Sequence, residues 1–142
     1  MNKVSTVITR KGILPVTVSP DITVVEALTI MAEKNIGSVV VMQNDEYLGI
    51  MTERDYSRKV ILKDKNSMTT KVSEIMSTDL PVVSPADSIE HCMQLMTEKN
   101  IRYMPVFDNN KLTGIISMSD VVKETILAQK ETINQLQNYI NS

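Results

Sequence analysis

Two short stretches of the sequence, GIMTERD and GIISMSD, each place a hydroxyl side chain three residues before an aspartate. The two pairs are Thr52 with Asp55 and Ser117 with Asp120. This spacing is typical of a helix start, where the hydroxyl accepts a backbone N–H of the first turn and the carboxylate lies at the positive end of the helix. The same helix end can bind a phosphate. A carboxylate one turn in can also accept two hydrogen bonds from a ribose diol, so helix capping and ligand binding both remain open.

Other reactive side chains are few. The only histidine, His91, is adjacent to the only cysteine, Cys92, and neighbouring residues on a helix point about 100° apart, which argues against a zinc site. We expect Cys92 in the core and His91 at the surface. Nucleophilic catalysis would depend on that single histidine as its base, and the sequence has no phosphate-binding glycine loop. We therefore expect no catalytic residues, no metal site and no enzymatic activity.

Composition excludes several classes of protein. With 42% hydrophobic and 23% charged residues over 142 positions, the chain has the balance of a globular protein, and its longest apolar runs are far too short to span a membrane. Fifteen basic residues against 17 acidic residues give none of the positive excess of a nucleic-acid binder. The N-terminus lacks the apolar core of a secretory signal, and a single cysteine fits a reducing compartment, so we expect a cytoplasmic location.

The chain contains an internal repeat. A shift of 65 residues aligns residues 18–56 with residues 83–121 without a gap, and a weaker echo relates residues 4–8 to residues 72–76. The first copy has about three additional residues around Gly12. Two copies of one supersecondary unit explain this pattern, and neither is long enough to bury both faces of its own sheet.

Each copy predicts the order short strand, helix, strand, strand, helix. The Ser-Pro pairs at Ser19 and Ser84 indicate a turn and a helix start. Apolar residues then follow at helical spacing, which are Val24, Ala27, Leu28 and Met31 in the first copy and Ile89, Cys92, Met93 and Met96 in the second. Hairpins are predicted with strands at 38–42 and 47–51, and at 103–107 and 112–116, and the next helices near Thr52 and Ser117.

The last helix is predicted to continue from Ser119 to the C-terminus. Ile126, Ile133 and Ile140 recur at sevenfold spacing, with Val122 and Leu136 beside them and Gln129 interrupting the apolar seam. This pattern is typical of a short coiled coil. Self-association through this helix and a helix folded back on its own domain are equally compatible with the sequence, and we expect a homodimer.

The doubled pattern VSPD, EKNIGSVVV, GIMTERD and VSPAD, EKNIRYMPV, GIISMSD resembles a tandem pair of cystathionine-beta-synthase (CBS) domains, also called a Bateman module. The resemblance implies an α/β (α+β) fold of two pseudo-twofold-related β-α-β-β-α units packed through their sheets, plus a long C-terminal helix. The expected boundaries are a first domain at 1–62, a linker at 63–71, a second domain at 72–127 and a helical extension at 128–142. The resemblance also implies clefts that bind adenine nucleotides.

Residue roles follow from the same resemblance. The family motif Gly-x-x-Thr/Ser-x-x-Asp falls on Gly49, Thr52 and Asp55 and on Gly114, Ser117 and Asp120. Its hydroxyl would face the phosphate or ribose and its aspartate the ribose hydroxyls. Strand residues would contact the adenine, and basic residues the phosphates. The implied surrounding set is Thr17, Val18, Ile36, Gly37, Arg54, Arg58, Lys59, Val83, Ile101, Arg102, Tyr103, Met104, Pro105 and Ile116.

The copies are not equivalent, because Arg102 corresponds to Gly37 and Arg54 to Ser119. We therefore expect one strong nucleotide site and one weak or empty site, with Arg102 the first candidate for the phosphates. AMP is the first expected ligand, with ADP, ATP or NAD as alternatives. The leading hypothesis is a nucleotide-sensing regulatory module that acts in trans on another protein. The alternative is a ligand-free structural or dimerisation module.

Overall fold

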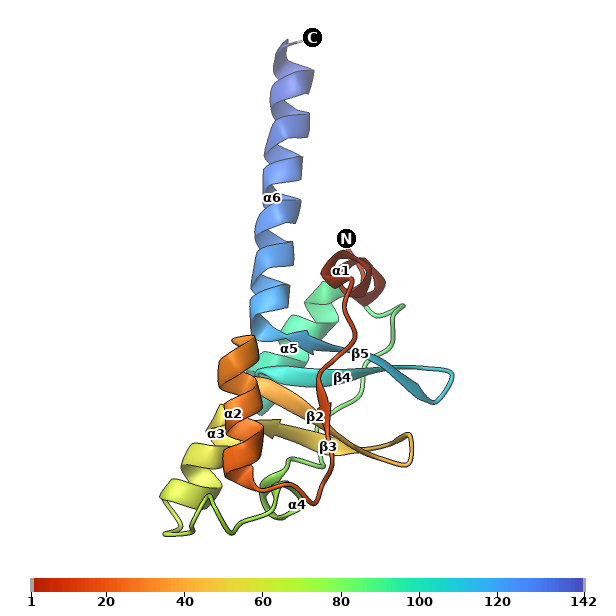
Figure 1. Cartoon of the computed structure of the whole chain (residues 1–142). Helices are drawn as coiled ribbons and strands as arrows, with labels where there is room; N and C mark the ends of the chain where they lie inside the picture. Colours follow the sequence, from red (N-terminus) through yellow and green to blue (C-terminus); the bar gives the residue numbers. More distant parts are fainter. Residues whose placement is uncertain (1, 142) are drawn as a thin grey trace. The chain divides into compact units, whose positions relative to one another are not determined.

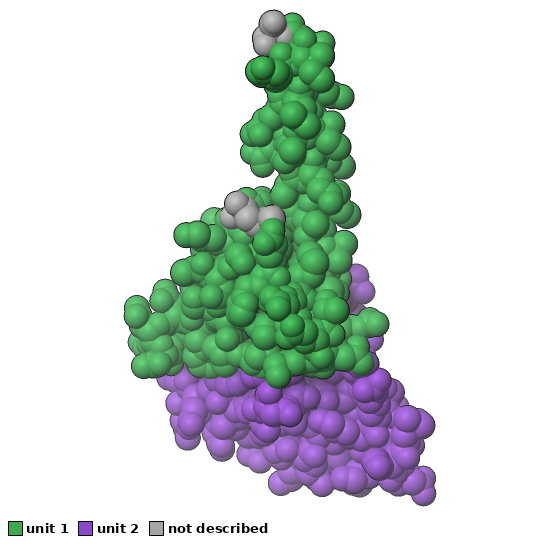
Figure 2. All heavy atoms as spheres, turned by 180° about the vertical axis from the view of Figure 1, so that it is seen from behind, with its two compact units in different colours: residues 1–14, 81–142 green, residues 15–80 purple. Residues whose placement is uncertain are grey.

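The computed structural model describes residues 2–141, which form two compact units (Figure 2). One unit consists of residues 15–80 and the other of residues 1–14 together with 81–142. Each compact unit therefore combines residues from both halves of the sequence. Residues 2–14 pack with the second copy of the repeat, and the segment that precedes that copy packs with the first.

The unit of residues 15–80 is built on a three-stranded sheet. Its strands are β1 (Thr17–Val18), β2 (Ser38–Gln43) and β3 (Glu46–Thr52), in the order β1-β2-β3. β1 is parallel to β2, and β2 is antiparallel to β3. The helical segments are α2 (Val24–Lys34), α3 (Glu53–Tyr56), the π-helical turn η1 (Ser57–Ile61) and α4 (Val72–Ile75). Figure 1 shows these elements along the chain.

Local signals explain these elements. Thr23 caps α2 in a capping box with Glu26, and Asn35 ends the helix in the left-handed conformation. Ser19 forms the predicted turn, and the helix begins a few residues later, after Thr23. Asn44 and Asp45 both have positive φ and close the β2–β3 hairpin as a two-residue turn. The predicted helix and strand core is confirmed, since Val24, Ala27, Met31, Val39, Val41 and Met51 are all buried.

The second unit repeats this arrangement, except that a single β-bridge replaces the edge strand β1. It contains α1 (Val4–Lys11), α5 (Ile89–Lys99), β4 (Tyr103–Asp108), β5 (Lys111–Ser117) and α6 (Met118–Asn141). β4 and β5 form an antiparallel hairpin, and Val83 makes an isolated parallel bridge to Val106 in the place of β1. Cys92 is fully buried in this core and His91 is exposed, as predicted.

The upstream echo in the sequence is a pair of companion helices. In one unit Val72 donates its N–H to the Ile22 carbonyl and Val24 donates to Thr70, which ties α4 to the start of α2. In the other unit Val4 donates to Asp87, and α1 lies at the start of α5 in the same way. α1 is longer than α4 and ends at Gly12, whose φ of 64° favours glycine.

α6 is the longest helix, and only its first turns pack on its own unit. Val121 and Glu124 are buried, whereas every residue from 129 to 141 is exposed. The interpretation of a helix folded back on its own domain is therefore wrong. None of the helices formed by residues 2–141 combines the length and the hydropathy that a membrane crossing requires.

Candidate functional site

The first motif forms a complete helix cap. Thr52 Oγ1 accepts the backbone N–H of Asp55 at 3.0 Å, and Asp55 Oδ2 accepts the backbone N–H of Thr52 at 3.0 Å. The Thr52 hydroxyl also donates to Asp55 Oδ2, again at 3.0 Å. The helix-cap interpretation is confirmed for this motif, and the cap turns the chain from β3 into α3.

The second carboxylate oxygen of Asp55 is also engaged. Asp55 Oδ1 accepts the hydroxyl of Ser77 at 2.9 Å and pairs with the Lys59 ammonium at 3.0 Å. Lys59 donates in addition to the Ile75 carbonyl at 2.9 Å, so it joins α3, η1 and the end of α4. Only 8% of the Asp55 side chain is exposed. A buried carboxylate with this many donors is held in one orientation.

The second motif has the same cap but a more open carboxylate. Ser117 Oγ accepts the N–H of Asp120 at 3.1 Å, and Asp120 Oδ2 accepts the N–H of Ser117 at 2.9 Å. Lys11, at the end of α1, pairs with the same Oδ2 at 3.0 Å and donates to the Ile115 carbonyl at 3.1 Å. Within residues 2–141, Asp120 Oδ1 accepts no hydrogen bond, and 18% of the side chain is exposed. Asp120 therefore keeps acceptor capacity that Asp55 has used.

A reversal of charge accompanies this difference. The 65-residue shift that aligns the repeats places Glu124 opposite Lys59. Glu124 is buried, with 2% of its side chain exposed, and it accepts hydrogen bonds from Arg10 and Asn2. In one unit the cation next to the motif aspartate thus comes from the following helical turn, and in the other it comes from α1. Two ion pairs, Arg10 with Glu124 and Lys11 with Asp120, hold α1 against α6.

The motif glycines are required by close neighbours rather than by backbone conformation. A Cβ on Gly49 would lie 2.6 Å from the Ser77 carbonyl oxygen, which also accepts the N–H of Ile50. A Cβ on Gly114 would lie 2.7 Å from Cδ1 of Ile8, the far end of a flexible side chain. The two positions are therefore equally crowded but unequal in their ability to relax.

Gly49→Ala is expected to lower the free energy of unfolding by about 1 to 2 kcal/mol, because the fixed backbone carbonyl of Ser77 must move. Gly114→Ala is the matched control and should cost less than about 1 kcal/mol, since Ile8 can change rotamer. Urea unfolding monitored by circular dichroism measures both. Equal losses would show that the backbone next to Gly49 yields as easily as a side chain.

The other predicted residues of the unit 15–80 lie near its motif to different degrees. The carbonyl of Gly37 accepts the N–H of Glu53, which places the start of β2 beside the cap. Thr17 is exposed and Val18 buried on β1, and Ile36 packs on the core. Arg54 lies within the capped turn, whereas Arg58 is exposed on η1.

In the second unit the predicted residues gather on the β4–β5 hairpin. Tyr103 pairs with Ser117, Met104 with Ile116 and Pro105 with Ile115, and Pro105 also accepts the N–H of Val83. The Arg102 carbonyl accepts the N–H of Met118, which places this exposed residue at the start of α6. The side chains of Val83, Met104 and Ile116 belong to the hydrophobic core, and Ile101 packs against it.

Sequence reasoning missed Lys11, Ser77, Arg10 and Glu124. Lys11 falls among the additional residues of the first copy, and Glu124 stands out as an acidic residue opposite a lysine in the repeat. Neither signal identifies the residue that the side chain contacts. Lys11 and Asp120 lie 109 positions apart in the sequence, and Arg10 and Glu124 lie 114 positions apart.

No alternative chemistry emerges elsewhere in residues 2–141. That part of the chain contains no cluster of three or more histidine, cysteine or acidic side chains arranged for a metal ion. Burial, reinforced by the charge of Asp87, raises the pKa of the Cys92 thiol to about 11. Cys92 is therefore protonated at neutral pH and a poor nucleophile.

Comparison with known proteins agrees with this architecture. The family model of the CBS domain matches residues 4–61 and again residues 72–126. The CBS domain-containing protein CBSX3, mitochondrial, of Arabidopsis thaliana is 38% identical over 125 residues, which is 84% of this chain and 61% of that protein. The chain therefore spans somewhat less than two thirds of the length of this relative.

Solved structures show the same fold. The CBS domain structure NE2398 is 40% identical, with a TM-score of 0.84 over 89% of this chain and 99% of that chain. The CBS domain pair of protein MJ0100, solved in complex with 5′-methylthioadenosine and S-adenosyl-L-methionine, has a TM-score of 0.77 at 22% identity and covers 92% of this chain and 98% of that chain. The predicted mixed α/β fold with paired repeats and a long C-terminal helix is thus confirmed.

Proposed function

The chain belongs to the CBS domain family, and we propose that it is a regulatory module that binds an adenine nucleotide and signals its occupancy to another protein. A CBS domain pair is generally a regulatory, ligand-binding module rather than a catalytic one. The adenosine-containing ligands of the MJ0100 domain pair support an adenine nucleotide as the ligand class. AMP is our first candidate, followed by ADP, ATP and NAD. Action in trans on a partner protein and a cytoplasmic location belong to the same proposal.

The observation that carries the proposal is the open acceptor of Asp120 at the start of α6. Its Oδ1 is available to a ribose hydroxyl, whereas both oxygens of Asp55 are engaged. α6 also offers the positive end of a 24-residue helix, and α3 has only four residues. We therefore assign the stronger site to the second motif, with Ser117 and Asp120 at the ribose and phosphate. Arg102 is the phosphate candidate because it is exposed beside that helix start.

A thermal-shift panel of AMP, ADP, ATP, NAD and S-adenosyl-L-methionine tests the function, with GMP as the control for the base. A ligand at about 100 times its dissociation constant should stabilise the chain by roughly 2.7 kcal/mol. The proposal expects stabilisation by at least one adenine compound and none by GMP. Guanine nucleotides that stabilise equally well would contradict adenine recognition.

The second candidate function is a ligand-free dimerisation module. It is favoured by the internal partners that already satisfy Asp55, and by the exposed apolar residues of α6. Failure of every nucleotide in the panel to stabilise the chain would leave this candidate in place.

A further inference from the structure

The C-terminal half of α6 has no packing partner within its own unit. All residues from 129 to 141 are exposed, yet they continue the helix without interruption. Isolated helices of this length are marginal in water, and most helical stability in proteins comes from packing of an apolar face. A surface that covers part of this segment would therefore stabilise it.

The exposed apolar residues of α6 form one seam. Val122, Ile126, Ile133, Leu136 and Ile140 are between 46% and 77% exposed and occupy the two core positions of a heptad repeat. A repeat of 3.5 residues stays on one face only if the helix supercoils around another helix. At 1.5 Å per residue the seam is about 27 Å long, enough for several core layers.

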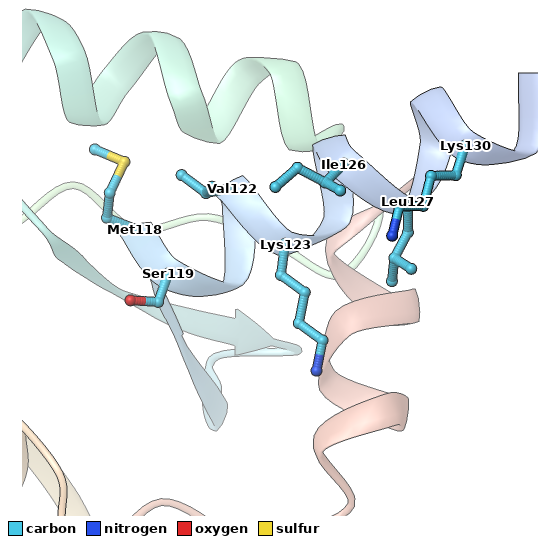
Figure 3. A pocket seen from close by; sticks show the side chains of 7 residues that line it. All are labelled: Met118, Ser119, Val122, Lys123, Ile126, Leu127 and Lys130. Carbon is cyan, nitrogen blue, oxygen red and sulfur yellow. The ribbon is translucent and has the colours of Figure 1, made fainter. Parts of the chain in front are cut away.

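The seam begins at a groove on the packed end of α6. A pocket of about 510 Å³ is lined there by residues of this helix, among them Val122, Ile126 and Leu127, and its lining is predominantly apolar. Figure 3 shows that the labelled lining side chains come from successive turns of α6, with Lys123 and Lys130 among them. The groove and the exposed apolar residues beyond it thus form one continuous surface along the helix, from Val122 to Ile140. We call this surface the α6 seam.

We propose that the α6 seam pairs with the α6 seam of a second copy of this chain, in parallel and in register. Gln129 selects the occupant, because it is the one polar residue at the core positions between Val122 and Ile140. In a parallel pair, the two Gln129 amides face each other and can exchange hydrogen bonds. In the antiparallel register that pairs the isoleucines with Val122 and Leu136, Gln129 would instead face Ile133 and leave a buried amide unpaired.

The flanking residues are compatible with this pair. In a parallel arrangement Lys130 of one helix faces Thr125 of the other, and Thr132 faces Gln137. No like charges therefore oppose each other along the α6 seam. The inference is independent of nucleotide binding, since it uses no residue of the motifs.

Light scattering of the full chain tests the pairing. Ile133→Asp should weaken association by about 100-fold or more, because two carboxylates would be buried in one layer. Asn134→Asp, on the polar side of the same turn, is the matched control and should leave the association unchanged. Because residue 133 lies in the exposed half of α6, both variants should keep the melting temperature of the dissociated chain.

Disulfide formation tests the orientation. Under mild oxidation, Ile140→Cys should cross-link two copies in high yield, since the parallel register places the two thiols in one core layer. Asn138→Cys, on the outer face, should cross-link poorly, and the buried Cys92 should not interfere. A monomeric chain, an association unaffected by Ile133→Asp, or equal cross-linking of the two cysteine variants would overturn the proposal. A seam that binds a different protein would also leave the purified chain monomeric.

Discussion

Replacing Arg10 with alanine is expected to lower the free energy of unfolding by about 2 to 3 kcal/mol. Arg10 pairs with Glu124, whose carboxylate is buried and has Asn2 as its other partner. Removing one partner of a fully buried pair typically costs about 3 to 5 kcal/mol, because the remaining charge is left uncompensated. Arg10 is itself 44% exposed, so solvent screening reduces that value here. Urea unfolding measures the loss.

The double variant Arg10→Ala/Glu124→Gln separates lost pairing from lost packing. The neutral amide can still accept from Asn2, so most of the stability should return, and the two changes should be strongly non-additive. Arg58→Ala removes an exposed basic residue of the other unit and should change the free energy of unfolding by less than about 0.5 kcal/mol. If Arg10→Ala changes the free energy of unfolding as little as Arg58→Ala, the ion pair of Arg10 with Glu124 contributes nothing to stability.

The repeated elements could be predicted because their signals are local. The helical spacing of Val24, Ala27 and Met31 and the Asn44-Asp45 turn act within a few residues of themselves. The same holds for the two caps at Thr52 and Ser117. Because the repeat presents each signal twice, an ambiguous segment in one copy is clarified by the other.

The partner of each companion helix could not be predicted. α1 precedes the first copy of the repeat but packs with the second, and nothing local in Val4–Lys11 specifies this. The ammonium of Lys59, expected near phosphates, is engaged by Asp55 and the Ile75 carbonyl. Such contacts depend on tertiary arrangement, which hydrophobic periodicity does not encode.

The structure also distinguishes the two motif aspartates as candidates for contact with the ribose. From the sequence, Asp55 and Asp120 are equivalent members of one motif, and the difference between the sites rests on arginine positions alone. Ser77 and Lys59 contact the oxygen of Asp55 that the helix cap leaves unused. Lys11 instead contacts the oxygen of Asp120 that already takes part in the cap. The asymmetry of the two copies therefore extends to the carboxylates themselves.

If Asp120 binds the ribose, the wild-type chain should bind 2′-deoxy-AMP about 10 to 150 times more weakly than AMP. This range corresponds to a hydrogen bond to a charged acceptor, worth about 1.5 to 3 kcal/mol. In Asp120→Ala the two ligands should bind almost equally. Isothermal titration of both ligands with both proteins forms a double cycle, and destabilisation of the helix cap cancels because it is common to the two ligands.

Asp55→Ala is the matched control, because it removes the same cap from the other motif. It should lower stability through the lost cap and ion pair, yet keep the preference for AMP over its deoxy analogue. Loss of that preference in Asp55→Ala instead would move the ribose site to the first motif, where Ser77 and Lys59 would have to release Oδ1. Equal binding of both ligands by the wild-type chain would mean that neither carboxylate contacts the 2′-hydroxyl, and both motifs would then act as helix caps alone.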